Sequence, residues 1–269
     1  MVKKLFAKGY LCVILAVLYL PIILIIVYSF SNSSNFSFAK GFSFGAYEAI
    51  VTSPQTPKLM KALENTFIIA AVSSVAATIL GTLAAIGIFT MKSKLRGLVE
   101  NINQLPIINS EIVMAVSLML FFVTFKIPAG LTRLILGHIS FCTPYVVLSV
   151  MPKLVQMDPN IYEAALDLGA SPFKAMIKVL FPMLVPGIVS GFVMSFTLSM
   201  DDFIITQINK SGGIETLSTY IYEDVRIKGM EPFWFAIFSI IFVVVLGIML
   251  IINLYNTRKK KEQSEEKEV

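Results

Sequence analysis

Three carboxylates lie inside long apolar segments of this 269-residue sequence. Glu111 is the only acid between residues 101 and 125, and Asp201 and Asp202 are the only acids between residues 179 and 209. A carboxylate at the centre of a membrane helix costs about 2.5–3.5 kcal/mol, so such residues face a watery cavity or a partner charge. The three acids therefore predict a path for a cation.

The segment 179–209 also carries polar residues at helical spacing. Four of them share one face of a helix: Ser195, Ser199, Asp202 and Thr206. Asp201 lies about 100° away around that helix, so both aspartates can serve a substrate only if the helix is locally unwound or the cavity is wide. Otherwise one of them has a structural role. The predicted substrate path consists of Glu111, Ser199, Asp201 and Asp202.

His138 is the only histidine of the chain. It has two interpretations, a proton relay or a hydrogen bond between helices, and we favour the second because no acid is near it in the sequence. Cys12 and Cys142 fall in apolar segments without the spacing of metal ligands, so we interpret them as packing residues. No nucleophile and base are paired. We therefore expect no catalytic residues, no metal site and no enzyme.

The elements that position these residues are membrane helices. Hydrophobic residues make up 56% of the chain, charged residues 14%, and the mean hydropathy is +0.79, outside the range of soluble domains. About 20 apolar residues cross a bilayer as a helix, which satisfies its own backbone hydrogen bonds. We predict one all-α domain over residues 1–257, a polytopic bundle of six transmembrane helices at about 9–30, 66–91, 103–125, 132–152, 183–208 and 233–256.

Basic residues indicate how the bundle is oriented. With both termini in the cytoplasm, the inner segments hold more Lys and Arg than the outer ones, as the positive-inside rule requires. The charged tail 258–269 then lies inside, where its basic run 258–261 contacts lipid head groups. The pI of about 9.1 reflects these basic residues at the membrane surface, so it does not indicate a nucleic-acid partner.

Two further patterns concern packing and depth in the bilayer. Small residues recur in the second span at four-residue spacing, as a ridge for close helix packing: Ser73, Ala77, Gly81 and Ala85. Trp234 and Tyr255 fall at the two ends of the last span. Aromatic residues at such positions are typical of the membrane interface.

The inner loop 153–182 has the signals of two short helices. A cap residue followed by proline favours a helix start, and this pair occurs twice: Asp158–Pro159 and Ser171–Pro172. Gly169 is placed to end the first helix, and we expect Pro182 to interrupt the second. A loop with this organisation suits docking onto another protein.

Seven residues of the loop match a known motif: Glu163, Ala164, Ala165, Gly169, Val179, Phe181 and Pro182. They resemble the EAA loop of ABC importer permeases, which more often has Ile and Leu in place of Val179 and Phe181. The resemblance implies the type I importer permease fold. It also implies that Glu163, Ala164, Ala165 and Gly169 belong to a coupling helix that fits a cleft in a cytoplasmic ATPase subunit. The chain has no GxxxxGK[ST] motif, so ATP is expected on that partner and no cofactor on this chain.

Three more segments carry the resemblance further: NSEIVMAVSL at 109–118, GHISFCTPYVV at 137–147 and SFTLSMDDF at 195–203. They look like the second permease subunit of bacterial spermidine/putrescine importers, many of which have Asp where this chain has Glu111. This implies a polyamine substrate, a bacterial plasma-membrane location, a sibling permease, paired ATPase subunits and an extracytoplasmic polyamine-binding protein. Aromatic faces between carboxylates suit separated ammonium groups, and the candidates are Tyr145, Phe196, Phe203 and Tyr220.

Two other functions stay open from the sequence. One is a permease of the same superfamily for another solute, such as iron, thiamine or an anion, although the acids disfavour anions. The other is a secondary transporter in which the three acids relay protons, although a gradient-driven carrier has no need of a docking loop. The sequence also leaves open whether spermidine or putrescine is preferred.

Overall fold

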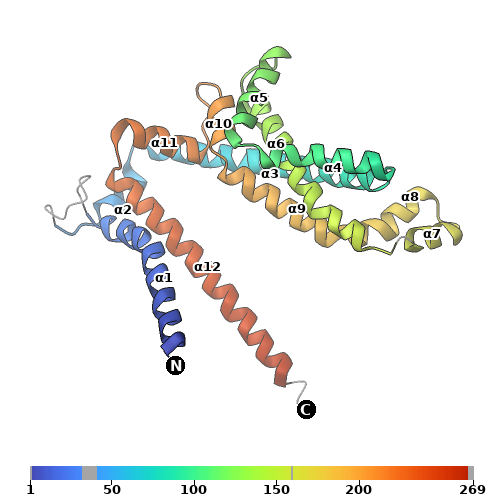
Figure 1. The fold of residues 1–269 in the computed structure, drawn as a ribbon. Helices are drawn as coiled ribbons and strands as arrows, with labels where there is room; N and C mark the ends of the chain where they lie inside the picture. The colour runs from blue at the N-terminus through green and yellow to red at the C-terminus, as the bar shows by residue number, and fades with distance from the viewer. Residues whose placement is uncertain (1, 32–40, 159, 266–269) are drawn as a thin grey trace. The chain divides into compact units, whose positions relative to one another are not determined.

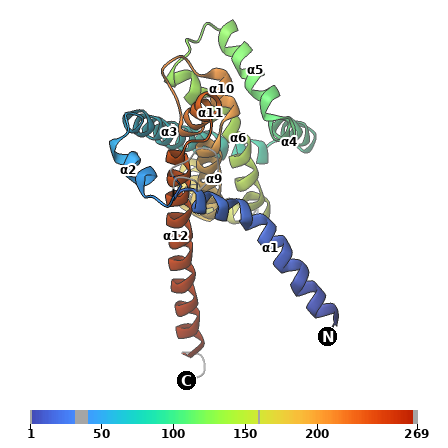
Figure 2. The ribbon, with the colours of Figure 1, turned by 90° about the vertical axis from the view of Figure 1, so that its left-hand side faces the viewer.

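The computed structural model describes residues 2–31, 41–158 and 160–265, and most of them are helical. These ranges contain no β-strand, so the prediction of an all-α protein is confirmed. The chain divides into two compact units: a central unit, Lys58–Tyr222, and a terminal unit made of the residues up to Pro57 and from Glu223 onward. Figures 1 and 2 show the helices from two directions.

The core of the central unit forms where two long helices pack along each other (Figure 1): α6 (Leu131–Gln156) and α9 (Phe181–Asp201). Glycines allow the close approach. A Cβ added at Gly191 would lie 3.1 Å from Val146 Cγ1, and one at Gly187 would lie 2.9 Å from Lys153 Cγ. The two helices therefore have a tight, fixed contact near their inner halves.

The predicted ridge of small residues lies on α3 (Thr56–Phe89) and is buried along its length. A Cβ added at Gly81 would lie 2.6 Å from Val146 Cβ, so the backbone of α3 packs directly on a side chain of α6. Ser73 Oγ also donates to the carbonyl of Ile135 on α6, at 3.3 Å. The ridge therefore packs α3 against α6, as predicted.

The third span differs from the prediction. Instead of one helix over 103–125, the chain forms two, α4 (Ser93–Ile108) and α5 (Glu111–Thr124), with a bend of 106° between them. Figure 1 shows the two helices meeting at a sharp corner. Asn109 and Ser110 are extended, with ψ of 153° and 144°, and Ser110 Oγ accepts the backbone N–H of Val113. The prediction missed that Ser110 is the cap of a new helix.

The inner loop forms the two short helices that its start and stop signals predict, α7 (Asn160–Asp167) and α8 (Pro172–Ala175). Asp158 Oδ1 accepts the backbone N–H of Asn160 at 2.9 Å. Gly169 ends the turn with φ of +82°, a conformation that glycine adopts without steric cost. Ser171 Oγ then accepts the backbone N–H of Lys174.

The expected interruption at Pro182 is wrong. Between α8 and α9 the chain forms a π-helical turn, η1 (Met176–Leu180), and helix continues through Pro182. The N–H of Phe181 donates to the carbonyl of Met176, five residues back. A wider turn removes the clash of the proline ring with the carbonyl four residues earlier. As a result, helix is continuous over the 30 residues of the stretch Pro172–Asp201.

The terminal unit contains α1 (Val2–Tyr28), α2 (Gly45–Thr52) and α12 (Pro232–Glu265), while α11 (Leu217–Lys228) includes the boundary between the units. Both α1 and α2 pack against α12. Trp234 is fully buried, and its Nε1 donates to Asp224 Oδ2 at 2.8 Å. Trp234 therefore packs inside the unit and does not contact lipid as a residue of an aromatic belt would, and the side chain of Tyr255 lies outside the described ones.

Four described helical stretches are long and apolar enough to cross a membrane: Gly9–Tyr28, Thr56–Phe89, Leu131–Gln156 and Pro172–Asp201. The bent pair of α4 and α5 meets the same criteria together, and α12 starts with a shorter apolar stretch, Pro232–Gly247. Each of the six predicted spans overlaps one of these segments.

Candidate substrate site and docking loop

The predicted stripe of polar residues lies where a long helix breaks. α9 ends at Asp201, and α10 (Ile204–Asn209) starts three residues later. Asp202 is extended, with ψ of 132°, and Phe203 has φ of −117°. The local unwinding that would let both aspartates serve one substrate is therefore present in the structure.

Asp202 is committed to this break. Its side chain is buried, and its carboxylate accepts the backbone N–H groups of Ile205 at 3.2 Å and Thr206 at 2.9 Å. Thr206 Oγ1 donates to Asp202 Oδ2 at 2.8 Å. The backbone carbonyl of Asp202 accepts from Ser218 Oγ at 2.7 Å. The residue thus caps the first turn of α10, where free N–H groups favour a carboxylate.

His138 of α6 reaches the same break. Its Nδ1 is 2.7 Å from Ser199 Oγ, and its Nε2 is 3.1 Å from Thr206 Oγ1 and 3.5 Å from Asp202 Oδ2. The imidazole is fully buried. His138 therefore makes hydrogen bonds between helices, as we favoured, but the sequence could not show the acid beside it because Asp202 approaches only through the fold.

Asp201 has the opposite environment. It is exposed, and its side chain has no hydrogen bond or ion pair with any residue that the structure describes. It occupies the last position of α9, where unpaired carbonyls and the helix dipole favour a cation. The two adjacent acids therefore differ: the carboxylate of Asp202 is hydrogen-bonded within the break, and that of Asp201 is exposed and unpaired among the described residues.

Glu111 is the first residue of α5 and is exposed. No hydrogen bond or ion pair joins it to either aspartate among the described residues. α5 nevertheless packs on α10, and Asn209 Nδ2 donates to the carbonyl of Ala115 at 3.1 Å. The structure thus brings the helix of Glu111 against the broken helix without bringing its carboxylate into contact with the other acids.

The four aromatic candidates also separate. Phe203 directly follows the acids and is half-buried against Tyr222, with ring centroids 4.7 Å apart. Tyr145 is half-buried and packs on Phe141, and Phe196 packs on Phe67 and Phe192. Tyr220 is only 6% exposed. Phe203 is therefore the candidate face next to Asp201, and Tyr220 is too buried to offer one.

The docking loop presents an accessible face. Glu163, Ala164 and Gly169 are exposed and Ala165 is half-buried. Four large apolar side chains of the same loop are also exposed: Ile161, Leu168, Phe173 and Ile177. Leu168 is 89% exposed, so the loop carries accessible apolar surface beside the motif residues.

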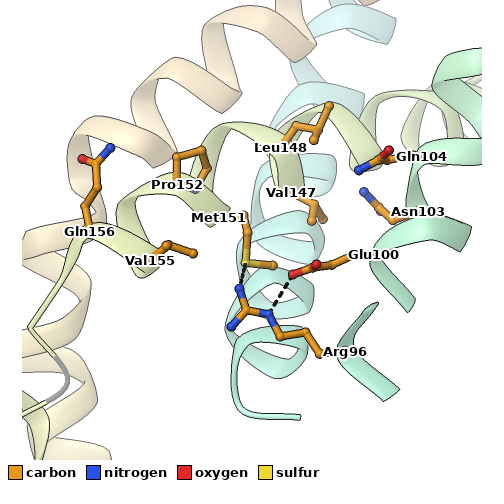
Figure 3. A pocket seen from close by; sticks show the side chains of 10 residues that line it. All are labelled: Arg96, Glu100, Asn103, Gln104, Val147, Leu148, Met151, Pro152, Val155 and Gln156. Carbon is orange, nitrogen blue, oxygen red and sulfur yellow. Dashed lines mark hydrogen bonds and ion pairs between the residues drawn. The ribbon is translucent and has the colours of Figure 1, made fainter. Parts of the chain in front are cut away.

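Two of the pockets near the inner ends of the helices border α6. One, of about 330 Å³, is mainly apolar and lies under α7, between Phe89, Leu154, Glu163 and Met176. The other, of about 380 Å³, lies between α4 and α6 (Figure 3). In it Arg96 Nε donates to Glu100 Oε1 at 2.8 Å. Because Glu100 is the one acid that lines this pocket and is already paired, the pocket offers no free carboxylate to a cation.

Comparison with known proteins assigns the family. Residues 77–261 match the family described as binding-protein-dependent transport system inner membrane component. The chain belongs to this family. It is therefore a multi-pass membrane protein of a transport system that uses a binding protein. The proton-coupled carrier, which the sequence left open, loses its support.

The relatives are similar over almost their whole length. The chain is 33% identical over 262 residues to the spermidine/putrescine transport system permease protein PotC of Escherichia coli K12, covering 97% of both chains. It is 32% identical to PotC of Haemophilus influenzae, covering 94% of this chain and 96% of that protein. It is 31% identical to the putrescine transport system permease protein PotI of E. coli K12, covering 91% and 88%.

Solved structures show the same fold at low sequence identity. A bacterial ABC transporter involved in the import of alginate superposes with a TM-score of 0.70 at 12% identity, covering 95% of this chain and 96% of that one. The alginate transporter in complex with its alginate-bound periplasmic protein gives 0.67 at 20% identity, covering 93% and 92%. The predicted helical permease fold is thus confirmed.

Proposed function

We propose that this chain is the membrane-spanning permease subunit of an ATP-driven ABC importer that carries polyamines, spermidine or putrescine, into the cell. The observation that carries the proposal is the 33% identity to PotC over 97% of both chains, since that protein is named for this transport. The exposed, unpaired Asp201 at the end of α9 supports a cationic substrate and disfavours an anion.

In the substrate path, each acid has a distinct task. Asp201 contacts one ammonium group, and Phe203 beside it supplies an aromatic face. Glu111, at the exposed start of α5, serves a second ammonium group of the same alkyl chain. Asp202 and Ser199 do not contact the substrate but hold the shape of the path, since both side chains are buried and hydrogen-bonded.

The docking loop couples the path to ATP. Glu163, Ala164, Ala165 and Gly169 enter a cleft of a cytoplasmic ATPase subunit, with the exposed apolar side chains of the loop around them. ATP is bound and hydrolysed by that partner. Both termini then lie in the cytoplasm, while a sibling permease and an extracytoplasmic polyamine-binding protein complete the importer.

The continuous helix Pro172–Asp201 connects these two regions directly. It starts in the docking loop and ends at the acid, and its 30 residues span roughly 45 Å at 1.5 Å per residue. When the ATPase subunits close on ATP, a push on α7 and α8 moves the helix Pro172–Asp201 and with it the Asp201 carboxylate. The cation site would thus open to the outside as the carrier protein releases its cargo.

Uptake of labelled spermidine tests the proposal. The chain is expressed with its neighbouring ATPase, sibling permease and binding-protein genes in transport-deficient cells, with unlabelled putrescine as competitor. We expect uptake that putrescine reduces and that disappears on ATP depletion. If the assembled complex imports no polyamine, the polyamine assignment is wrong and only the family assignment stands. Uptake of an unrelated solute would identify that solute as the substrate instead.

A further inference from the structure

We propose that His138 is a positioning residue that fixes the break between α9 and α10 and thereby holds Asp201 at the exposed end of α9. This inference rests on the proposed function, in which Asp201 contacts the transported cation. It adds a role for a buried side chain on α6 that does not itself reach the path.

The hydrogen-bonded chain has a direction. Thr206 Oγ1 donates to Asp202 Oδ2 at 2.8 Å, and a hydroxyl has a single hydrogen to donate. Thr206 must therefore accept from His138 Nε2, 3.1 Å away. The other ring nitrogen, Nδ1, is left for Ser199 Oγ at 2.7 Å. One imidazole thus connects a residue of α9 with a residue of α10.

This bridge opposes a specific alternative, a continuous helix through the break. Closing the break would restore backbone hydrogen bonds that the last carbonyls of α9 and the first N–H groups of α10 now lack. It would also enclose Asp201 within the helix and remove the free helix end beside its carboxylate. Because His138 contacts both halves at once, it holds them at the separation that the open break requires.

The surroundings make the bridge rigid. His138 and Thr206 are fully buried, and Ser199 is only 4% exposed. A buried polar network resists rearrangement because each lost hydrogen bond leaves an unsatisfied group. On the far side, Ser218 Oγ donates to the carbonyl of Asp202 at 2.7 Å. The break is therefore fixed from α6 on one side and from the start of α11 on the other.

A first experiment reads the position of residue 201 without using transport. The chain has two cysteines, Cys12 and Cys142, so changing both to Ala and adding Asp201→Cys leaves one thiol. Its labelling by a cationic methanethiosulfonate reagent is followed in the assembled complex. We expect rapid labelling with His138 intact, and labelling slowed about fivefold or more by His138→Phe.

Thr206→Val is a second variant of nearly the same shape, which removes the hydroxyl that links His138 to Asp202; it should slow labelling in the same direction. Both cysteine replacements are present in every variant, so each labelling rate is compared with that of the same background with His138 and Thr206 intact. If neither variant changes the labelling rate, the inference is overturned.

Uptake with Asp201 intact is the second readout. We expect His138→Phe to lower the maximal rate of spermidine uptake per assembled complex about tenfold. His138→Gln, which retains an N–H near the position of Nε2, should give an intermediate rate. A merely structural role for His138 would reduce the amount of complex and leave the rate per complex unchanged, which would contradict the inference.

The two readouts separate this inference from the proposed function. Labelling that depends on His138, without any spermidine uptake by the unmodified complex, would overturn the polyamine assignment and support the positioning of Asp201. Spermidine uptake that is normal in every His138 variant, with unaltered labelling, would support the polyamine assignment and overturn the positioning role of His138.

Discussion

Two broken helices place the three acids of the apolar segments, and the two breaks are built differently. The break before Glu111 rests on a local cap, in which Ser110 accepts one N–H at 3.4 Å. The break after Asp201 is fixed by buried groups from α6, α9 and α10 and by a half-buried serine at the start of α11, with distances of 2.7–3.1 Å for the closest contacts. The helices on both sides of the first break pack on α6 and α10, but the break itself has only a local cap, whereas the second break is bridged by side chains from several helices.

The difference indicates where precision is needed. A carboxylate beside a well-fixed helix end can bind one ammonium group in a defined place. A carboxylate on a locally capped helix can adapt its position to an alkyl chain of variable length. We therefore expect changes at the second break to have the larger effects, and changes at the first break to have graded ones.

Asp202→Asn should have the largest effect on the folded protein. In the variant an NH2 group takes the place of Oδ2, which accepts from the backbone N–H and the hydroxyl of Thr206. About two charge-assisted hydrogen bonds are lost, at about 1.5–3 kcal/mol each. Thermal unfolding of the purified complex measures the loss, and the neighbouring Asp201→Asn is the matched control. Equal stability of the two variants would contradict the structural role of Asp202.

Asp201→Asn should leave stability within about 0.5 kcal/mol, as for other exposed positions. Uptake of spermidine per complex should fall about 10- to 100-fold because the negative charge at the end of α9 is lost. Initial uptake rates over a range of concentrations measure this. If the Asn variants at 201 and 202 both transported normally at normal protein levels, the prediction of a cation path would be wrong.

Glu111→Gln should reduce uptake about three- to tenfold, since this acid lies at the less firmly held break. Glu111→Asp retains the charge and serves as the control, with uptake expected within about twofold of the unmodified protein. Competition between spermidine and putrescine should change more in the Gln variant than the uptake of either alone. No change in that competition would remove Glu111 from the path.

Ser110→Ala should have the smallest effect. Loss of the cap of α5 costs about 1 kcal/mol of stability, and uptake should stay within about twofold. Ser110→Thr, which retains a capping hydroxyl, provides the comparison in the same unfolding assay. A loss of uptake as large as that of Asp201→Asn would show that the two breaks are equally critical.

Local signals in the sequence predicted much of this architecture. Gly169 and the pair Ser171–Pro172 carry their own conformational preferences, and the first docking helix ends and the second begins where these residues predict. The ridge around Gly81 was predictable because small side chains at a four-residue period serve close packing whatever the partner. The helical permease fold followed from composition and from the resemblance of the docking loop.

The features that were missed depend on contacts between distant residues. The break at Asp202 is bridged by His138, and the buried Trp234 donates to Asp224 of the preceding helix. The π-turn before Pro182 was missed because a proline inside a helix was expected to end it, whereas a wider turn also accommodates it. The division of work between Asp201 and Asp202 therefore needed the structure.

Reconstitution of the complete importer in proteoliposomes tests the central claim most directly. ATP enclosed with the ATPase subunits, with the binding protein and labelled spermidine on the opposite side, should give accumulation of spermidine that requires ATP hydrolysis. Replacement of the docking residues Glu163 to Gly169 should abolish it, and Asp201→Asn should reduce it at least tenfold. ATP hydrolysis by an intact complex, stimulated by the loaded binding protein, without spermidine accumulation would contradict the account.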